Sequence, residues 1–141
     1  MKTKMKKWKA GENFLYPKLS YLLLGCIYDV RNTYGNGQKE LVYQNALAEK
    51  LKLAKIPFKK EVNISIKSED TGRTLGSYKL DFVVDKKIIV EAKALKFTPS
   101  KIQQQLYSYL KSTPYKLGYL VNFGSTKLYF KRVILTKKSI R

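Results

Sequence analysis

Charged residues interrupt two neighbouring segments that otherwise have the composition of buried β-strands. The segments are residues 78–84 and 88–94, and both are rich in the β-branched and aromatic residues that favour a pleated sheet. Asp81 lies inside the first segment, and Glu91 lies ten positions later inside the second. Because a charge buried in a strand needs a compensating partner, this spacing constrains the fold more than any other feature of the chain.

The length of the loop between the two strands, residues 85–87, determines whether these charges meet. A three-residue loop places Asp81 opposite Glu91 on one face of an antiparallel pair. The same register places Lys79 opposite Lys93. Two facing carboxylates destabilise a sheet unless something neutralises them, and a divalent cation would do so. A two-residue loop would instead put the two carboxylates on opposite faces, and pairing of Asp81 with a surface lysine is a further alternative.

The composition restricts the chemistry that the chain can perform. Its 141 residues include no histidine and a single cysteine, Cys26, which lies in an apolar stretch. These counts exclude histidine-based acid–base catalysis, cysteine-rich zinc sites and a disulfide framework. With 29 lysines and arginines against 10 acidic residues, the formal charge is +19, which favours a polyanion such as nucleic acid as partner.

Both ends of the chain are predicted to be basic tails around a single domain. The tails are residues 1–16 and 136–141, and the domain is residues 17–135. The basic start lacks the apolar core of a signal peptide, and no stretch approaches the ~20 apolar residues that span a bilayer. We therefore expect a cytoplasmic protein with no membrane partner.

Hydrophobic periodicity and turn residues predict an α/β domain. Helices are expected at 17–34, 38–56 and 99–112, and strands at 58–67, 75–84, 88–94, 117–122 and 127–135. The first three strands should form an antiparallel meander. The last helix, with Thr98 and Pro99 as its cap and start, should provide a right-handed crossover to a parallel strand. We therefore expect a single mixed sheet flanked by helices.

The second predicted helix carries a carboxylate on its apolar face. Glu40 precedes Tyr43 by three residues and Leu47 by seven, so it shares their stripe, which continues to Ala54. A carboxylate there either satisfies free amides in the first helical turn, with Gly37 as cap, or contributes to a functional site.

Together these residues offer the groups that metal-dependent phosphodiester hydrolysis requires. Asp81 and Glu91 would coordinate Mg²⁺ or Mn²⁺, together with the backbone carbonyl of Ala92. Lys93 would orient the attacking water and stabilise the negative charge that develops at phosphorus. Glu40 would complete the metal shell directly or through water. We expect the three carboxylates to converge within reach of one cation.

Further residues are expected to contact the substrate. Gln105 and Tyr109 are one turn apart on the last helix and can face the same groove, although Tyr109 would equally suit the core. Tyr43 and Tyr109 would stack on a nucleic-acid strand, and Lys96 and Lys101 would contact its phosphates.

The order of these motifs resembles a known family. Gly37-Gln38-Lys39-Glu40-Leu41-Val42-Tyr43 matches the pattern that names the GxxExxY proteins, a branch of the PD-(D/E)xK nuclease superfamily. Over roughly residues 17–135 the chain is similar to that family also at Asp81, Glu91-Ala92-Lys93, Gln105-xxx-Tyr109 and Val121-Asn122-Phe123-Gly124. The resemblance implies a restriction-endonuclease-like core whose active set is Glu40, Asp81, Glu91, Lys93 and Gln105, with Tyr109 positioning the substrate or the helix. One departure is that Leu80, rather than proline, precedes Asp81.

The sequence thus predicts a Mg²⁺- or Mn²⁺-dependent deoxyribonuclease that acts by in-line attack of a metal-activated water. DNA is favoured over RNA as the substrate. So small a chain would also suit a homo-oligomer or an accessory of a larger complex. The alternative is a non-catalytic nucleic-acid-binding module that retains a nuclease-like fold.

Overall fold

The computed structural model describes residues 15–135. The predicted tails at 1–16 and 136–141 lie outside this range, apart from Leu15 and Tyr16. The elements in chain order are α1 (Pro17–Tyr34), α2 (Glu40–Leu53), β1 (Phe58–Lys67), β2 (Thr74–Val84), β3 (Ile88–Lys93), α3 (Ser100–Lys111), β4 (Leu117–Asn122) and β5 (Tyr129–Ile134). This order is the predicted one, and no element end differs from its prediction by more than three residues.

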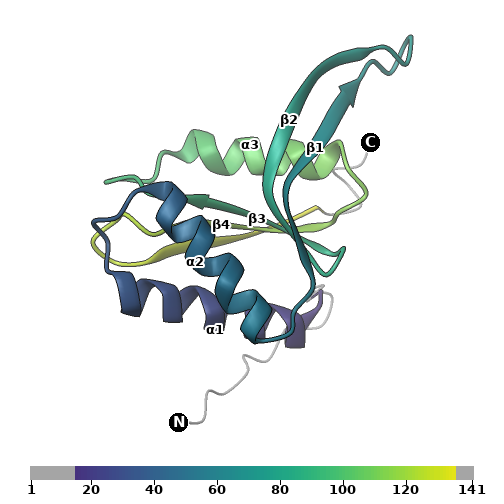
Figure 1. Cartoon of the computed structure of the whole chain (residues 1–141). Helices are drawn as coiled ribbons and strands as arrows, with labels where there is room; N and C mark the ends of the chain where they lie inside the picture. Colours follow the sequence, from purple (N-terminus) through teal and green to yellow (C-terminus); the bar gives the residue numbers. More distant parts are fainter. Residues whose placement is uncertain (1–14, 136–141) are drawn as a thin grey trace, which may run out of the picture.

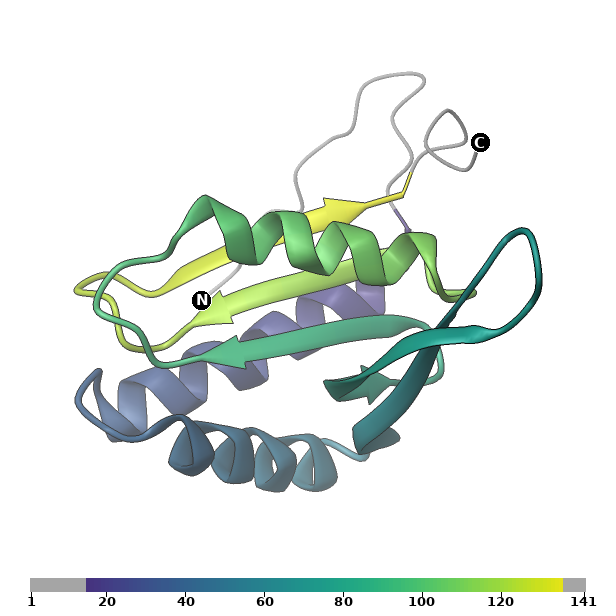
Figure 2. The same cartoon turned by 90° about the horizontal axis from the view of Figure 1, so that it is seen from above.

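The five strands form one mixed sheet in the order β1-β2-β3-β4-β5. The meander of β1, β2 and β3 is antiparallel, β3 and β4 run parallel, and β5 is antiparallel to β4. The helix α3 makes the crossover between the two parallel strands and covers one face of the sheet, while α1 and α2 cover the other (Figures 1 and 2). The predicted α/β fold, with a single mixed sheet flanked by helices, is confirmed.

The larger hydrophobic core lies between the sheet and the helices α1 and α2. Each helix contributes a stripe of fully buried side chains, which are Leu23, Ile27 and Val30 in α1 and Tyr43, Leu47 and Leu51 in α2. They pack against alternate residues of the central strands, including Ile88, Val90 and Ala92 of β3. Burial of each large apolar side chain contributes roughly 1.5–3 kcal/mol. Ala54, predicted to lie on this stripe, is exposed because α2 ends at Leu53.

The smaller core lies between the sheet and α3. Leu106, Tyr109 and Leu110 of α3 are buried against the opposite sheet face, which includes Ile89 and Leu120. Since β3 places Ile89 in this core and its neighbours in the other, side chains alternate along the strand as predicted. Glu91 and Lys93 follow on the face of Ile89.

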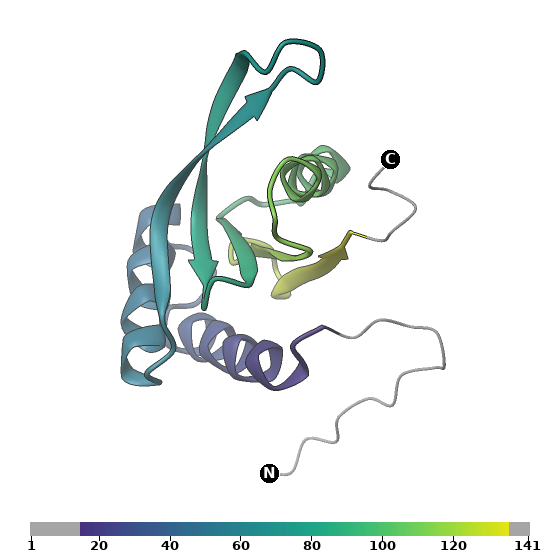
Figure 3. The ribbon, with the colours of Figure 1, turned by 90° about the vertical axis from the view of Figure 1, so that its right-hand side faces the viewer.

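The strands β1 and β2 are longer than the rest and form a twisted ribbon that projects beyond the body of the sheet (Figures 1 and 3). Midway along it, Glu61 adopts φ 52, and neither Glu61 nor the facing Asp81 takes part in the ladder. On one side of this kink Phe58 packs on the larger core, and on the other side Val62 packs on the smaller one. A left-handed residue inside a strand bends and twists it. The kink therefore carries the ribbon from one sheet face to the other.

No helix within residues 15–135 is both long enough and apolar enough to cross a bilayer.

Candidate active site

The loop between β2 and β3 has the three residues that bring the two carboxylates together. Val84 pairs with Ile88, and the Lys87 amide donates to the Val84 carbonyl at 2.9 Å. Asp85 and Lys86 turn the chain with φ values of 49 and 57. The register that this loop fixes makes Asp81 and Glu91 neighbours across the strands, so the three-residue alternative is the correct one.

The two carboxylates replace hydrogen bonds of the β-ladder where β2 leaves β3. The ladder ends at the pair Phe82 and Val90. Beyond it the Asp81 amide donates to Glu91 Oε1 at 3.1 Å, and the Ala92 amide donates to Asp81 Oδ2 at 2.8 Å. Each carboxylate is thus oriented by a backbone amide of the facing strand.

The predicted pairing of Lys79 with Lys93 is wrong. Lys79 pairs with Asn63 of β1 instead, because β2 follows β1 away from β3 beyond the kink at Glu61. This divergence opens the edge of β3 at the level of Asp81.

Burial makes the negative charge of this pair costly. Glu91 is only 6% exposed, and desolvation together with the Asp81 charge raises the pKa of its carboxyl to about 8. Desolvation also raises the pKa of Asp81, against the opposing effects of the Ala92 amide and the Lys93 charge. A buried and a half-buried carboxylate whose pKa values are both raised favour a bound proton or cation.

Glu40 joins these groups from the first residue of α2. Desolvation raises the pKa of its carboxyl, and repulsion from Asp81 adds to that effect. Its Oε2 accepts a hydrogen bond from Gln44 Nε2 at 3.2 Å, and the Gln44 amide also lowers the pKa of Asp81. Lys39, rather than Gly37, occupies the N-cap, and no side chain caps the helix. Glu40 therefore faces the strand carboxylates.

Lys93 provides the positive charge of the site. Its ammonium lowers the pKa of Glu40, Asp81 and Glu91. No direct ion pair joins it to these acids in the part of the chain that the structure describes. The amine is therefore close enough to act on all three carboxylates and is not held by any one of them.

The expected convergence of three carboxylates on one cation is not found. Among residues 15–135, no three acidic or cysteine side chains are grouped closely enough to hold a metal by themselves. The carboxylates of Asp81 and Glu91 accept backbone amides, and that of Glu40 accepts the Gln44 amide, so each is oriented by its own partner. The hydrogen bonds between β2 and β3 bring the strand pair together, and Glu40 acts on it from the first residue of α2.

The backbone carbonyl oxygen of Ala92 lies on the same side of β3 as the Asp81 carboxylate. Within a strand the N–H and C=O of one residue point in the same direction. Because the Ala92 amide points to Asp81, its carbonyl points into the gap between β2 and β3 as well. Two carboxylates and one carbonyl are the hard oxygen donors that Mg²⁺ and Mn²⁺ prefer, so the residues present fit such an ion.

Helix α3 covers the sheet face that carries Ile89 and Glu91, and it contributes Tyr109 and Gln105 there. Tyr109 is 6% exposed, its ring lies 4.9 Å from that of Tyr78, and desolvation together with the Glu91 charge raises the pKa of its hydroxyl to about 12. Gln105 precedes it by one turn and is exposed. Within residues 15–135 no hydrogen bond joins the Gln105 side chain to the carboxylates, so its predicted role remains a proposal.

The sequence predicted that Tyr43 stacks on the substrate. This prediction is wrong, because the Tyr43 side chain is fully buried. Its ring stacks on Phe123 with centroids 4.7 Å apart, and its hydroxyl donates to the Gly35 carbonyl at 2.6 Å. The same hydroxyl accepts the Gln38 amide at 3.1 Å. Tyr43 thus fixes the loop before α2 and thereby the position of Glu40.

The segment after β3 is fixed by Asn122, whose role the sequence did not reveal. This buried side chain accepts the amides of Leu95 and Gly124, at 2.9 and 3.0 Å. It also donates to the Leu95 carbonyl at 3.0 Å and to Thr98 Oγ1 at 2.8 Å. Thr98 therefore does not cap α3, and Pro99 occupies the N-cap instead.

The two lysines predicted to contact phosphate, Lys96 and Lys101, lie exposed on this segment and on the first turn of α3. Because both side chains are exposed, they are free to contact phosphate, and this role stays a prediction.

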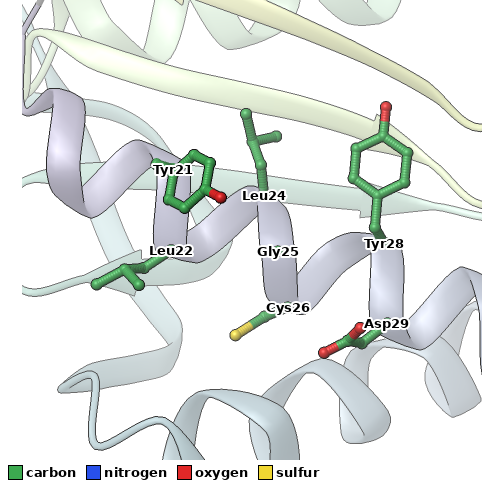
Figure 4. A pocket seen from close by; sticks show the side chains of 7 residues that line it. All are labelled: Tyr21, Leu22, Leu24, Gly25, Cys26, Tyr28 and Asp29. Carbon is green, nitrogen blue, oxygen red and sulfur yellow. The ribbon is translucent and has the colours of Figure 1, made fainter. Parts of the chain in front are cut away.

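A depression of ≈ 430 Å³ lies elsewhere, on the outward side of α1 (Figure 4). Gly25 forms its floor, because nothing lies within 4 Å of the position that a side chain would occupy. Its lining is mostly apolar and includes Cys26, a buried thiol whose pKa is raised by desolvation and by Asp29. Cys26 packs in the core as a small hydrophobic residue, and this surface lacks the paired carboxylates of the site at β2 and β3.

Comparison with protein-family models gives a match to the PD-(D/E)XK nuclease superfamily over residues 17–133. The matched range holds both strand carboxylates, Glu40 and Lys93, and its five-stranded mixed sheet agrees with a restriction-endonuclease-like fold. Among curated proteins, no match to the chain is found.

Proposed function

Since the chain belongs to the PD-(D/E)XK nuclease superfamily, we propose that it is a nuclease that hydrolyses phosphodiester bonds of DNA with the help of Mg²⁺ or Mn²⁺. The observation that carries the proposal is the pair of carboxylates on β2 and β3, the buried Glu91 and the half-buried Asp81, each oriented by a backbone amide. The motif from Gly37 to Tyr43 further supports a place in the GxxExxY branch of that superfamily.

The metal would be held by Asp81, Glu91 and the carbonyl of Ala92, with Glu40 acting behind them. The chemistry that a divalent cation supplies when bound is the activation of water and the polarisation of the scissile phosphate. A pure binding module would have no use for two adjacent carboxylates where a phosphate must approach, because they repel it. The retained pair therefore favours catalysis over binding alone.

The remaining residues act on the substrate. Lys93 would stabilise the charge that gathers on the phosphate and would orient the attacking water. Gln105 would help to position the substrate from α3, and Tyr109 would hold the helix or the strand beside Glu91. Tyr43 would act only through Glu40, whose helix it anchors.

The positive charge of the chain supports nucleic acid as the substrate, and we propose DNA. A charge of +19 attracts phosphates regardless of sequence. Lys96 and Lys101 would contact phosphates beside the site.

The test is DNA cleavage, with single- and double-stranded substrates, in Mg²⁺, in Mn²⁺ and in a chelator. We expect the wild type to cut only with metal. Glu91→Gln and Lys93→Ala should each reduce the cleavage rate by about 100-fold or more, as expected for groups that act in the transition state.

Lys52→Ala provides the matched control, since Lys52 is an exposed lysine in the last turn of α2 and its removal lowers the net charge as Lys93→Ala does. It should cut like the wild type. DNA binding without cleavage in either metal would contradict the nuclease proposal and would favour a binding module with a nuclease-like fold.

A further inference from the structure

The loop that follows Lys93 of β3 presents an aromatic ring to solvent. Phe97 is 76% exposed and follows Lys93, the last residue of β3, by four positions. The Lys96 ammonium lies 5.9 Å from the centre of its ring. An exposed apolar side chain alone is ordinary, so its meaning depends on how the loop is held and on what surrounds it.

The loop is held firmly on both sides of Phe97. Asn122 bonds both the amide and the carbonyl of Leu95 and also the hydroxyl of Thr98. Gly124 packs so closely that a Cβ there would lie 2.7 Å from the backbone of Ala94 and Leu95. Because Asn122 is itself fully buried, this clamp fixes the loop while leaving the ring exposed.

All charged residues that flank the ring in the sequence after Glu91 are positive. Glu91 is the last acidic residue of the chain, so residues 92–141 contain no aspartate or glutamate. Lys93 and Lys96 precede the ring, and Lys101 follows it on the first turn of α3. A fixed aromatic face among lysines suits a nucleotide, whose base stacks while its phosphate meets the cations.

We propose that Phe97 is a stacking platform for an unpaired nucleobase, with Lys96 and Lys101 contacting the adjacent phosphates. The substrate class is then single-stranded nucleic acid or an unpaired end, because a base within a duplex has no free face to offer. This inference rests on the proposed function, because the stacked base would belong to the same strand whose phosphate reaches Lys93.

The inference is tested by binding in a chelator, where no cleavage occurs. A short single-stranded oligonucleotide containing 2-aminopurine and the same oligonucleotide in duplex form are titrated with wild type, Phe97→Ala and Phe97→Trp. Phe97→Ala should weaken single-strand binding by about 5- to 50-fold and should abolish the protein-induced quenching of 2-aminopurine. It should change duplex binding by less than about twofold, and Phe97→Trp should restore both the affinity and the quenching, because tryptophan also stacks.

Leu53→Ala is the matched control, since Leu53 is 78% exposed at the end of α2, outside the loop. It should bind both forms as the wild type does. Wild-type affinity of Phe97→Ala for the single strand, or an equal loss for single strand and duplex, would overturn the inference. If Phe97→Ala loses single-strand binding but the wild type never cleaves in Mg²⁺ or Mn²⁺, the stacking platform is supported and only the nuclease proposal is overturned.

Discussion

At the scale of single residues, the site is defined by where negative charge is buried. Glu91 is almost fully buried beside Asp81, and both carboxyls have a raised pKa because desolvation outweighs the help of the amides and of Lys93. At neutral pH the metal-free protein must therefore keep a proton on Glu91 or bear the cost of its buried charge. A bound cation would remove that cost, which links folding stability to both pH and metal.

Glu91→Gln should remove a pH dependence of stability from the metal-free protein. In the folded state the Glu91 pKa is about 8, whereas an unfolded glutamate titrates near about 4.3. Between these values only the folded state keeps the proton, so the stabilising contribution is complete below the unfolded pKa and is lost as the pH rises through the folded one. The free energy of unfolding of the wild type, measured by urea denaturation in a chelator, should fall by about 5 kcal/mol relative to Glu91→Gln across this range. Parallel curves for the two proteins would contradict the burial of that charge.

Gly124→Ala should destabilise the protein through the loop that carries Phe97. A Cβ at Gly124 would lie 2.7 Å from two backbone atoms of the Ala94–Leu95 linkage, and backbone cannot move aside without disturbing the Asn122 hydrogen bonds. We expect a loss of about 1–3 kcal/mol in the free energy of unfolding. Gly25→Ala in α1 is the control, since it meets no atom and should be neutral or should stabilise the helix by up to about 1 kcal/mol. Equal effects at the two positions would show that the loop is not packed as described.

At the scale of elements, the site depends on the kink in the β1–β2 ribbon. The ladder between β2 and β3 is only three pairs long, whereas β1 and β2 pair along most of their length. The ribbon therefore leaves the sheet at Asp81, and the vacated edge of β3 offers the Ala92 amide to that carboxylate. Without the left-handed residue Glu61, a straight ribbon would continue along β3 and would cover this edge.

Substitutions at Glu61 should separate backbone shape from charge. Glu61→Asn keeps access to positive φ, which asparagine tolerates, and should leave the thermal midpoint and cleavage close to the wild type. Glu61→Val disfavours positive φ and should lower the free energy of unfolding by about 1–2 kcal/mol and reduce cleavage. The control is Asn63→Val, which lies in the regular ladder and should be neutral or mildly stabilising. The same stability for Glu61→Val and Asn63→Val would contradict the role of the kink.

Local signals allowed the elements to be predicted, and long-range contacts account for what was missed. Pro17 and Gly35 mark the observed ends of α1, and the three-residue loop fixes the pairing of Asp81 with Glu91. Tyr43 was misassigned to the substrate because helical periodicity cannot tell a buried tyrosine from one that faces a groove. Likewise, the anchoring by Asn122 joins segments 27 residues apart, which no local pattern reports. The hydrogen bond from Gln44 to Glu40 is different, because the two residues are four positions apart in one helix and local spacing alone predicts such a contact.

At the scale of the whole molecule, a strong positive charge surrounds a small buried negative cluster. The formal charge is +19, while Asp81 and Glu91 lie together between two strands of one sheet. The surface charge would gather nucleic acid without regard to sequence, and the cluster would confine the chemistry to one point.

Binding of DNA should accordingly depend steeply on salt. Displacement of counterions by several lysines predicts that the affinity for a single strand, measured by fluorescence anisotropy in a chelator, falls by about 10-fold or more between roughly 50 and 200 mM salt. Lys96→Ala should make the dependence less steep, whereas Phe97→Ala should lower the affinity and leave the slope unchanged, because stacking displaces no counterion. An affinity that does not change with salt would contradict the electrostatic account.

The most direct measurement is an anomalous difference map from crystals soaked in Mn²⁺. The account predicts a peak that contacts the carboxylates of both Asp81 and Glu91, and the loss of that peak in crystals of Glu91→Gln. A peak bound elsewhere, or a wild-type map without density between these two side chains at saturating Mn²⁺, would contradict it.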